Sequence, residues 1–199
     1  MWDERYAVDD YVYGKQPNDF LREHHARLSG KRVLCLAEGE GRNAVFLAQQ
    51  GYEVCAIDTS AVAKEKALKL ADEYGVSIDY QVADLDTFDL GEQQWDGVVS
   101  IFCHLASSVR ASLHRRVARA LRSGGVLLLE AYTPAQLLNG TGGPPSADMM
   151  MTGQQLREEL SGLSFELLQE IQREVKEGRY HCGLGDVVQV ISRSPVAVY

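Results

Sequence analysis

Residues 32–58 constrain the fold of this chain more than any other stretch. Two short apolar runs, residues 32–36 and 54–57, are bounded and partly β-branched, which is typical of buried parallel strands. Between them lie residues 37–43, which read AEGEGRN, and an apolar helical pattern that Gly51 is placed to end in a left-handed conformation. The stretch therefore predicts one strand–helix–strand unit with a glycine turn at its front edge.

The glycine turn is a candidate ligand site. Gly39 and Gly41 let backbone approach a ligand closely, and Asp58, after the second apolar run, is placed to accept from both hydroxyls of a ribose. Because Ala44 also completes the Gly-x-Gly-x-x-Gly/Ala pattern, a dinucleotide such as NAD fits the spacing. A strand–turn–helix without a ligand is the plain structural alternative.

The charges at the turn favour a different ligand. A pyrophosphate at this helix N-terminus would face Glu38 and Glu40, with Arg42 as the single counter-charge in the turn. S-adenosylmethionine has an adenosine but no phosphate, and nearby carboxylates stabilise its ammonium and sulfonium groups. We therefore expect S-adenosylmethionine as the cofactor in preference to NAD.

The composition of the chain limits the classes of partner that it is expected to bind. The net charge of −8 over 199 residues argues against a nucleic-acid or anionic membrane partner and leaves small-molecule substrates. A chain of this length is expected to form one domain, residues 1–199. Its four cysteines lack the paired spacing that zinc requires, so no metal site is expected. With no signal peptide and no apolar run of membrane-spanning length, we expect a cytoplasmic protein.

Residues 1–30 are rich in aromatic and charged side chains and precede the first strand. They are therefore expected to lie over the sheet or its ligand edge. Tyr13 and its neighbours would suit a lid, because tyrosine combines an apolar ring with a polar hydroxyl. The alternative is that these aromatics only pin an N-terminal arm to the body.

The chain after Asp58 repeats the strand–helix alternation. Thr59 and Ser60 can cap a helix over residues 61–74, and a third strand is expected at 78–83. Asp84 and Leu85 follow that strand directly. At this position the Asp84 carboxylate can accept a hydrogen bond from an adenine amino group, and the backbone at Leu85 can contact the edge of the adenine ring. A turn aspartate is the alternative.

A fourth strand at 97–102 places Phe102 and His104 at the carboxyl edge of the sheet, where ligands bind in open α/β folds. The next helix has apolar residues at i, i+4 spacing, and a fifth strand at 126–130 leads to Tyr132. The arginines of that helix are expected to form a solvated face. They are Arg110, Arg115, Arg116, Arg119 and Arg122.

The pattern changes after the fifth strand. Residues 133–151 hold several glycines and three methionines, which predicts a mobile substrate lid with an adaptable apolar surface. Thr152 and Gln155 form a capping box for a helix through residue 160. Strands expected at 165–175 and 186–192 have too few residues between them for a parallel crossover, so they should pair as an antiparallel hairpin. Its connection contains His181.

Alternating strand–helix units finished by an antiparallel hairpin resemble the Rossmann-like class I methyltransferases. That fold is α/β, with a doubly wound, mostly parallel seven-stranded sheet. The whole chain is similar to the tellurite-resistance (TehB-type) and thiopurine-methyltransferase-like enzymes. The segments that carry the resemblance are WDERY at 2–6, YVYG through Pro-Asn at 11–18, EGEGRN at 38–43, Asp84-Leu85, TGGP at 141–144 and EG-x-YH-x-G at 177–183.

The resemblance implies that Gly39 and Gly41 line the methionine moiety of the donor, Asp58 its ribose and Asp84-Leu85 its adenine. On this layout, residues 1–30 form an arm or lid, 31–131 the donor-binding core and 132–199 the acceptor side. The expected donor site also includes Glu38, Arg42, Thr59, Phe102 and Tyr13.

Two positions depart from the family pattern. Many methyltransferases have an acid at the position of Cys35 and a glycine at that of Ala37. Loss of the acid is expected to weaken one support of the turn. Alanine at 37 predicts an ordinary backbone conformation there.

Methyl transfer from a sulfonium needs mainly exclusion of water and alignment of the reactants, with a base only for acceptors protonated at neutral pH. The acceptor-side candidates are His181, His104 and Tyr132, each of which could instead be loop packing. Two rival functions are a donor-binding sensor or partner subunit without turnover, and a nicotinamide-dependent reductase. The sequence does not name the acceptor, and a monomer or weak homodimer is expected.

Overall fold

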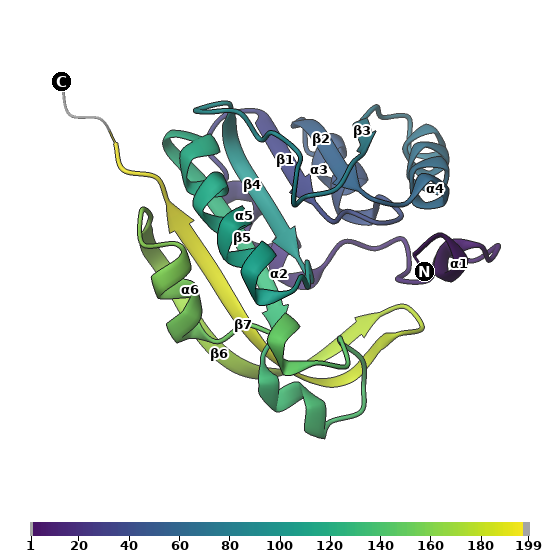
Figure 1. Cartoon of the computed structure of the whole chain (residues 1–199). Helices are drawn as coiled ribbons and strands as arrows, with labels where there is room; N and C mark the ends of the chain where they lie inside the picture. The colour runs from purple at the N-terminus through teal and green to yellow at the C-terminus, as the bar shows by residue number, and fades with distance from the viewer. Residues whose placement is uncertain (1, 197–199) are drawn as a thin grey trace.

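A computed structural model describes residues 2–196, which form one sheet with helices on both faces (Figure 1). Met1 of the expected arm and residues 197–199 of the expected acceptor-side segment lie outside the described residues. The strands are β1 (Arg32–Leu36), β2 (Glu53–Asp58), β3 (Asp79–Val82), β4 (Trp95–Ile101), β5 (Leu121–Tyr132), β6 (Ser164–Glu177) and β7 (His181–Arg193).

The strand order is β3-β2-β1-β4-β5-β7-β6. β7 runs antiparallel to β5 and β6, and the other neighbouring pairs are parallel. The sheet is therefore the mostly parallel one that the sequence predicts, finished by an antiparallel hairpin. The hairpin is longer than expected, so that His181 is the first residue of β7 and not part of the turn.

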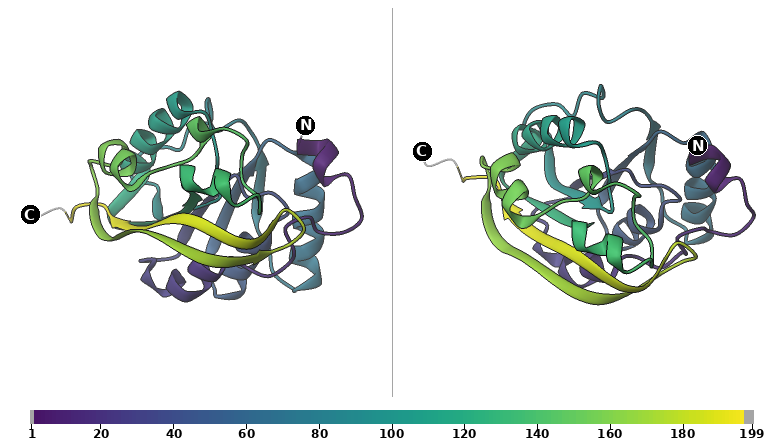
Figure 2. Two further views of the ribbon diagram at one scale, coloured as in Figure 1. Left: turned by 90° about the horizontal axis from the view of Figure 1, so that it is seen from below. Right: turned by 60° about the horizontal axis from the view of Figure 1, so that its bottom comes forward.

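Helices cover both faces of the sheet (Figure 2). They are α1 (Trp2–Tyr6), α2 (Asp19–His24), α3 (Arg42–Gln49), α4 (Ala61–Glu73), α5 (Ser107–Ala120) and α6 (Gly153–Glu159), with 3₁₀ turns η1 (His25–Arg27), η2 (Pro134–Leu138) and η3 (Ala147–Met149). None of the helices between residues 2 and 196 combines the length and apolar character that a membrane span requires.

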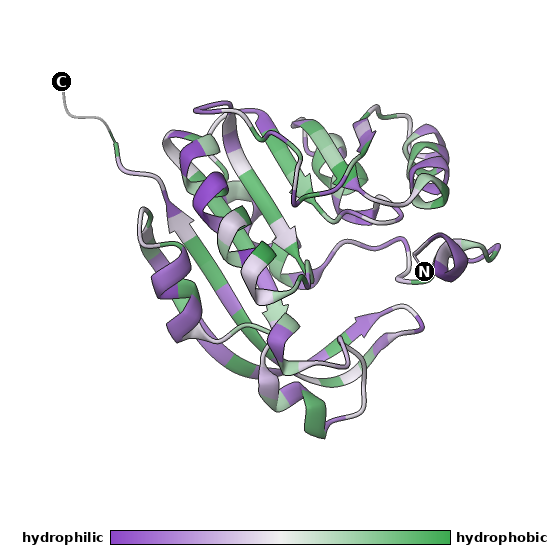
Figure 3. Cartoon of the chain, viewed as in Figure 1, coloured by the Kyte–Doolittle hydropathy of each residue, from purple (hydrophilic) through white to green (hydrophobic). Residues whose placement is uncertain are grey.

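The central strand β1 is buried on both faces. Leu34 and Leu36 pack into the core beneath α5 and α6, while Val33 and Cys35 pack into the core beneath α2, α3 and α4. Because side chains alternate along a strand, each apolar residue of β1 serves one of the two layers. Figure 3 shows the apolar residues concentrated along the central strands and the polar ones on the outer sides of the helices.

The helix ends follow the predicted signals. Gly51 and Gly75 have φ of 90° and 65°, so each ends its helix in the left-handed conformation that glycine allows. Ser60 accepts from the Ala63 N–H (3.0 Å) at the start of α4. Thr152 and Gln155 form the predicted capping box of α6.

The arginines of α5 do not form the solvated face that the sequence predicts. Arg110 is 2 % exposed, and its guanidinium donates to Glu159 of α6 (2.9 Å) and to two backbone carbonyls before that helix. Arg116 donates to two carbonyls of the loop after β3, whereas Arg115 and Arg119 are exposed. The apolar stripe identifies one buried face of α5 but does not show that α6 covers the adjacent face.

The loop at residues 133–151 enters the core at its C-terminal end. Met150 and Met151 are 0 and 1 % exposed, and the Met151 N–H donates to the Tyr132 carbonyl (3.0 Å). The prediction that these two methionines supply an adaptable surface is therefore wrong, because they fill the core beside β5. The mobility of the loop stays a prediction.

Ala37 adopts the left-handed conformation with φ of 48°, contrary to the ordinary backbone that alanine predicts. The chain turns sharply here because the Glu38 N–H donates to the Ile57 carbonyl of β2 (3.0 Å). This hydrogen bond fixes the path from β1 into the glycine turn. The conformation costs an L-residue about 1–2 kcal/mol.

A buried polar network joins the N-terminal arm to the hairpin. The Asn18 amide donates to Glu130 of β5 and Glu177 of β6, both at 2.8 Å. Arg42, at the start of α3, pairs with Glu177, and Arg173 of β6 pairs with both carboxylates. Burial alone would raise the pKa of Glu177, but the Arg42 and Arg173 guanidiniums hold it below its ordinary value. The network fixes the arm, the glycine turn and the hairpin relative to one another.

Replacing Glu177 by glutamine should lower the free energy of unfolding by about 3 kcal/mol, because a buried ion pair loses one partner. Glu174→Gln on the same strand is the control, since its pair with Lys176 is largely exposed and should contribute less than about 1 kcal/mol. The pKa of Glu177 is depressed, so its contribution exists above the ordinary carboxyl pKa and is lost as pH falls below it. Urea unfolding at pH 7 and pH 3 should therefore show a difference that narrows in acid, and equal losses in the two variants would contradict the network.

Replacing Ala37 by glycine should raise the free energy of unfolding by up to about 1 kcal/mol. Relief of the left-handed strain exceeds the added entropy of the unfolded chain, which is about 0.4–1 kcal/mol. The matched control is Ala111→Gly inside α5, which should lose about 1 kcal/mol. Denaturant unfolding of both variants checks the sign, and destabilisation by Ala37→Gly would contradict the strain.

Candidate functional site

The glycine turn and the end of β2 meet at the carboxyl edge of the sheet. Asp58 accepts from the Gly39 N–H (2.9 Å) with one carboxylate oxygen and from the Ser60 N–H (3.0 Å) with the other. Burial raises the pKa of Asp58, and these backbone donors offset the rise only in part. Each oxygen keeps a further lone pair, so Asp58 can still accept from two hydroxyl groups.

The two glycines of the turn serve different neighbours. A Cβ at Gly41 would lie 2.6 Å from the Ala67 Cβ, so Gly41 lets the start of α3 pack against α4. A Cβ at Gly39 would lie 2.8 Å from the Tyr6 hydroxyl, and the Tyr80 hydroxyl donates to the Gly39 carbonyl (2.6 Å). Tyr80, which sequence reasoning missed, and Tyr6 of the arm therefore enclose the turn.

The cations near the turn are already paired. Lys66 of α4 binds the buried Glu40 carboxylate (2.6 Å), which also accepts from the Tyr13 N–H (3.3 Å). Arg42, expected among the donor-binding residues, pairs with Glu177 and donates to the backbone of the arm (3.2 Å). Neither cation is therefore free to bind a phosphate at this helix N-terminus.

Glu38 supplies the support that the sequence predicts to be weakened at Cys35. Its carboxylate is buried and accepts from the Ala44 N–H (2.7 Å), with further stabilisation from the Asn43 N–H. The N-cap residue of α3, Gly41, has no side chain to accept these donors. The structure thus corrects the expectation, because an acid three residues after Cys35 holds the turn. Burial raises the pKa of Glu38 to about 7.

The loop after β3 has the geometry of an aspartate turn. Asp84 is exposed, and one of its carboxylate oxygens accepts from the Asp86 N–H (2.9 Å). Leu85 is buried, and Arg116 binds its carbonyl. Thr59 is exposed between β2 and α4. The roles of Asp84, Leu85 and Thr59 toward a donor stay predictions.

Aromatic side chains from distant segments gather beside the turn. Phe102, at the end of β4, lies 4.7 Å from both Tyr132 of β5 and His181 of β7, measured between ring centroids. Tyr13 of the arm lies 4.8 Å from His181. Phe102 has φ of 52°, a strained backbone that bulky residues rarely adopt outside functional sites. The structure therefore brings these predicted site residues into one cluster.

The two candidate histidines differ in their hydrogen bonds. His104 Nδ1 lies 3.0 Å from the Met149 carbonyl, and its Nε2 lies 3.4 Å from the Tyr132 N–H. This arrangement requires the tautomer in which Nδ1 donates and Nε2 accepts. Burial lowers the pKa of His104 to about 4, so the ring is neutral and engaged with backbone.

His181 has a free nitrogen instead. Burial lowers the pKa of His181 to about 3, so the ring is neutral at physiological pH. Its Nδ1 and the Tyr132 hydroxyl are buried without a hydrogen-bond partner among the described residues. Buried polar atoms are nearly always paired, so these two atoms indicate a place for a polar ligand group.

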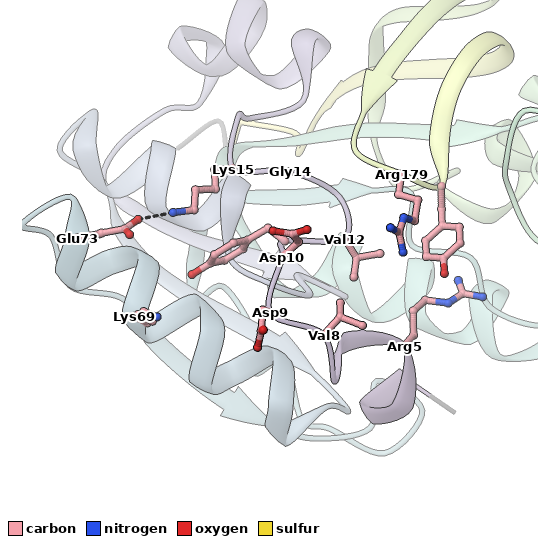
Figure 4. A pocket seen from close by; sticks show the side chains of 12 residues that line it. Arg5, Val8, Asp9, Asp10, Val12, Gly14, Lys15, Lys69, Glu73 and Arg179 are labelled. Carbon is pink, nitrogen blue, oxygen red and sulfur yellow. Dashed lines mark hydrogen bonds and ion pairs between the residues drawn. The ribbon is translucent and has the colours of Figure 1, made fainter.

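A hollow of about 510 Å³ opens between the arm, α4 and the hairpin turn (Figure 4). At one end Lys15 pairs with Glu73 (2.6 Å). At the other end the Arg5 guanidinium lies 5.1 Å from the Tyr180 ring centroid and donates to the Tyr13 hydroxyl (3.1 Å). Through Tyr13 and Tyr180, the hollow borders the aromatic cluster.

Residues 33–125 match the model of a family described as a methyltransferase domain. None of the curated proteins compared matches this chain. A structure from work on the conversion of a disulfide bond into a thioacetal group during echinomycin biosynthesis has a TM-score of 0.75 at 21 % identity, covering 98 % of this chain and 89 % of that one.

Two further solved structures are similar. A SAM-dependent methyltransferase from Methanosarcina mazei has a TM-score of 0.65 at 17 % identity, covering 92 % of this chain and all of that one. TehB from Haemophilus influenzae has a TM-score of 0.70 at 19 % identity, covering 88 % of this chain and 61 % of TehB. The chain therefore has the Rossmann-like fold of class I methyltransferases, with the matched methyltransferase-domain segment forming the part of the sheet that carries the glycine turn.

Proposed function

We propose that this protein is a S-adenosylmethionine-dependent methyltransferase that acts on a small-molecule acceptor. One observation carries the proposal. An acid-rich glycine turn whose nearby cations are already paired lies beside Asp58, within the segment that matches the methyltransferase-domain model. Such a turn suits a donor with cationic groups and a ribose but no phosphate.

The residues present fit the donor. The Gly39 backbone would border its methionine part, Asp58 would accept from its ribose hydroxyls, and Asp84 with Leu85 would meet its adenine. When bound, S-adenosylmethionine supplies an electrophilic methyl group on a sulfonium. NAD fits less well, because Lys66 and Arg42 are held by Glu40 and Glu177.

The chain contributes exclusion of water and orientation of the acceptor. Phe102, Tyr132 and Tyr13 surround His181 and form an apolar wall. With its pKa near 3, the neutral His181 imidazole is too weak a base to hold a proton from a thiol, hydroxyl or amine at neutral pH, but its unpartnered Nδ1 can form a hydrogen bond that orients such a group. The Tyr132 hydroxyl can orient the same group. His104 keeps the loop before α6 in place through its backbone contacts.

We further propose that the enzyme is of the TehB and thiopurine-methyltransferase-like type. The motifs at both ends of the chain support this placement, since the arm and the hairpin carry them and meet at the site. The Arg179 N–H donates to the Val12 carbonyl (2.8 Å). A donor-binding sensor without turnover is the alternative that the experiments must exclude.

Calorimetry with S-adenosylmethionine, its demethylated product and NAD in parallel tests the cofactor. Binding of the first two without NAD is expected, and tight NAD binding would overturn the proposal. A panel of thiols, amines and oxyanions with methyl-labelled donor then tests turnover. Donor binding without transfer to any of them would favour the sensor.

Asp58→Ala should weaken donor affinity by about a hundredfold, since charged hydrogen bonds contribute about 1.5–3 kcal/mol each. Asp58 also holds two backbone N–H groups, so the variant should be somewhat less stable as well. Asp58→Asn, which keeps an acceptor for one of them, separates the two effects. Unchanged affinity in both folded variants, measured by calorimetry, would remove Asp58 from the donor site.

His181→Ala should lower turnover while donor affinity changes by less than about threefold, because the residue acts on the acceptor. His104→Ala should instead lower the free energy of unfolding by about 1–3 kcal/mol, since two backbone partners are left unpaired. The pKa of His181 is near 3, so its imidazole NMR signals should not titrate between pH 5 and 8. Full turnover in His181→Ala, or titration near pH 6.5, would contradict this role.

A further inference from the structure

The Glu38 side chain caps the N-terminus of α3, although Glu38 precedes the N-cap residue by three positions. A capping side chain normally belongs to the N-cap residue itself, but here that residue is Gly41, with φ of 88°. Glu38 reaches past it and accepts from the Ala44 N–H (2.7 Å), while its own N–H donates to the Ile57 carbonyl of β2 (3.0 Å). One residue therefore links β2, the glycine turn and the first turn of α3.

The groups around the Glu38 carboxylate leave its charge poorly compensated. Asp58 of β2 opposes its ionisation, while Arg42 of α3 favours it, although Arg42 is itself engaged by Glu177. Cys35 of β1 is a buried thiol in contact with the carboxylate, and burial raises the pKa of that thiol. Tyr80 of β3 binds the Gly39 carbonyl (2.6 Å) and also stays neutral.

Within residues 2–196, Glu38 lacks the bound cation that Glu40 has, and it shares this lack with Asp58. Glu40 binds the Lys66 ammonium (2.6 Å), and each Asp58 oxygen accepts from a backbone N–H. Glu38 has backbone donors at the helix N-terminus, but no ammonium or guanidinium donates to it among the described residues. Glu38 is therefore a buried acid beside a second carboxylate, Asp58, so a cation arriving there would favour its ionised form.

We propose that Glu38 is a proton-linked positioning residue, which holds the glycine turn and releases a proton when a cationic donor binds beside it. The inference rests on the proposed function. In the free protein the carboxyl is partly protonated near neutral pH. A sulfonium and an ammonium beside the turn favour the carboxylate, which binds the α3 amides more strongly than the acid form does.

The sign of the coupling follows from linkage. The free carboxyl has a pKa near 7, raised by burial. A donor that favours the carboxylate lowers this pKa, so donor affinity rises with pH through the neutral range. Each unit of lowering corresponds to about a tenfold gain in affinity. The demethylated product lacks the sulfonium charge, so it should couple more weakly.

Calorimetry of donor binding at pH 7 in buffers of different ionisation enthalpy measures the released proton. A one-unit lowering of the Glu38 pKa should release about 0.4 proton per donor. Glu38→Gln keeps an oxygen that can accept from the Ala44 N–H but cannot ionise. Donor binding to this variant should therefore release about 0.4 proton fewer than binding to the wild type. Any proton from the donor's own amino group appears in both proteins and cancels in the difference. Glu65→Gln, on the exposed side of α4, changes the net charge equally and should release as much as the wild type.

A second comparison uses the wild type alone, in case Glu38→Gln does not fold. The donor should release more protons than the demethylated product, and its affinity should fall as pH is lowered from 8 to 6. Equal release by wild type and Glu38→Gln, or by donor and product, would overturn the role of Glu38. Failure of the wild type to bind the donor at all would instead overturn the proposed function, and this inference with it.

Discussion

The buried ion pair between Arg42 and Glu177 is the contact on which the rest of the site depends. Arg42 begins α3 directly after the glycine turn, and Glu177 ends the outermost strand of the sheet. Inside a protein such a pair is tolerated only if its remaining donors and acceptors are satisfied. Asn18 and Arg173 provide those partners and extend the contact to the arm and to Glu130 of β5. One polar core therefore sets the distance between the glycine turn and the hairpin.

The three carboxylates near the glycine turn each stabilise a different part of it. Asp58 ties the turn to the start of α4, Glu40 binds Lys66, and Glu38 holds the first amides of α3. Negative charge is thus concentrated where a cationic ligand would compensate it, while nearby positive charge is directed into ion pairs. The aromatic cluster beside the turn has the opposite character, because His181 and His104 are kept neutral by burial. An acid-rich turn and an aromatic cluster with neutral histidines therefore adjoin each other.

The strand–helix–strand unit that carries the glycine turn could be predicted from sequence because its determinants are local. β1, α3 and β2 follow one another within 27 residues, both strands lie within about one residue of the expected bounds, and α3 ends just before Gly51. The acceptor side depends on contacts between distant residues. The partners of Arg42 and Arg110 lie 135 and 49 residues away, and no spacing rule relates them. The sequence predicts both His181 and His104 as acceptor-side candidates, and the structure distinguishes them by their hydrogen bonds.

Reasoning from local sequence also failed at the support of the glycine turn, which Glu38 provides in place of an acid at position 35. The chain shows a cysteine at 35 and an acid at 38, but the sequence does not reveal that the Glu38 side chain turns back to the α3 amides. Ala37 is a related case, because the path of the chain between β1 and β2 imposes a left-handed backbone on a residue that does not favour it. In both cases tertiary constraints override local preference.

The meeting of the arm with the hairpin has a consequence for synthesis on the ribosome. Asn18 and Arg42 are made well before their partner Glu177, which lies 135 residues after Arg42. Until then, Arg42 lacks its buried carboxylate partner, and the sheet lacks its final two strands. A nascent chain released early would carry a complete β1–α3–β2 unit with an unpaired arginine at its ligand edge. Completion of the site therefore waits for the synthesis of β6 and β7, and a product truncated before them has the glycine motif without the contacts that close it.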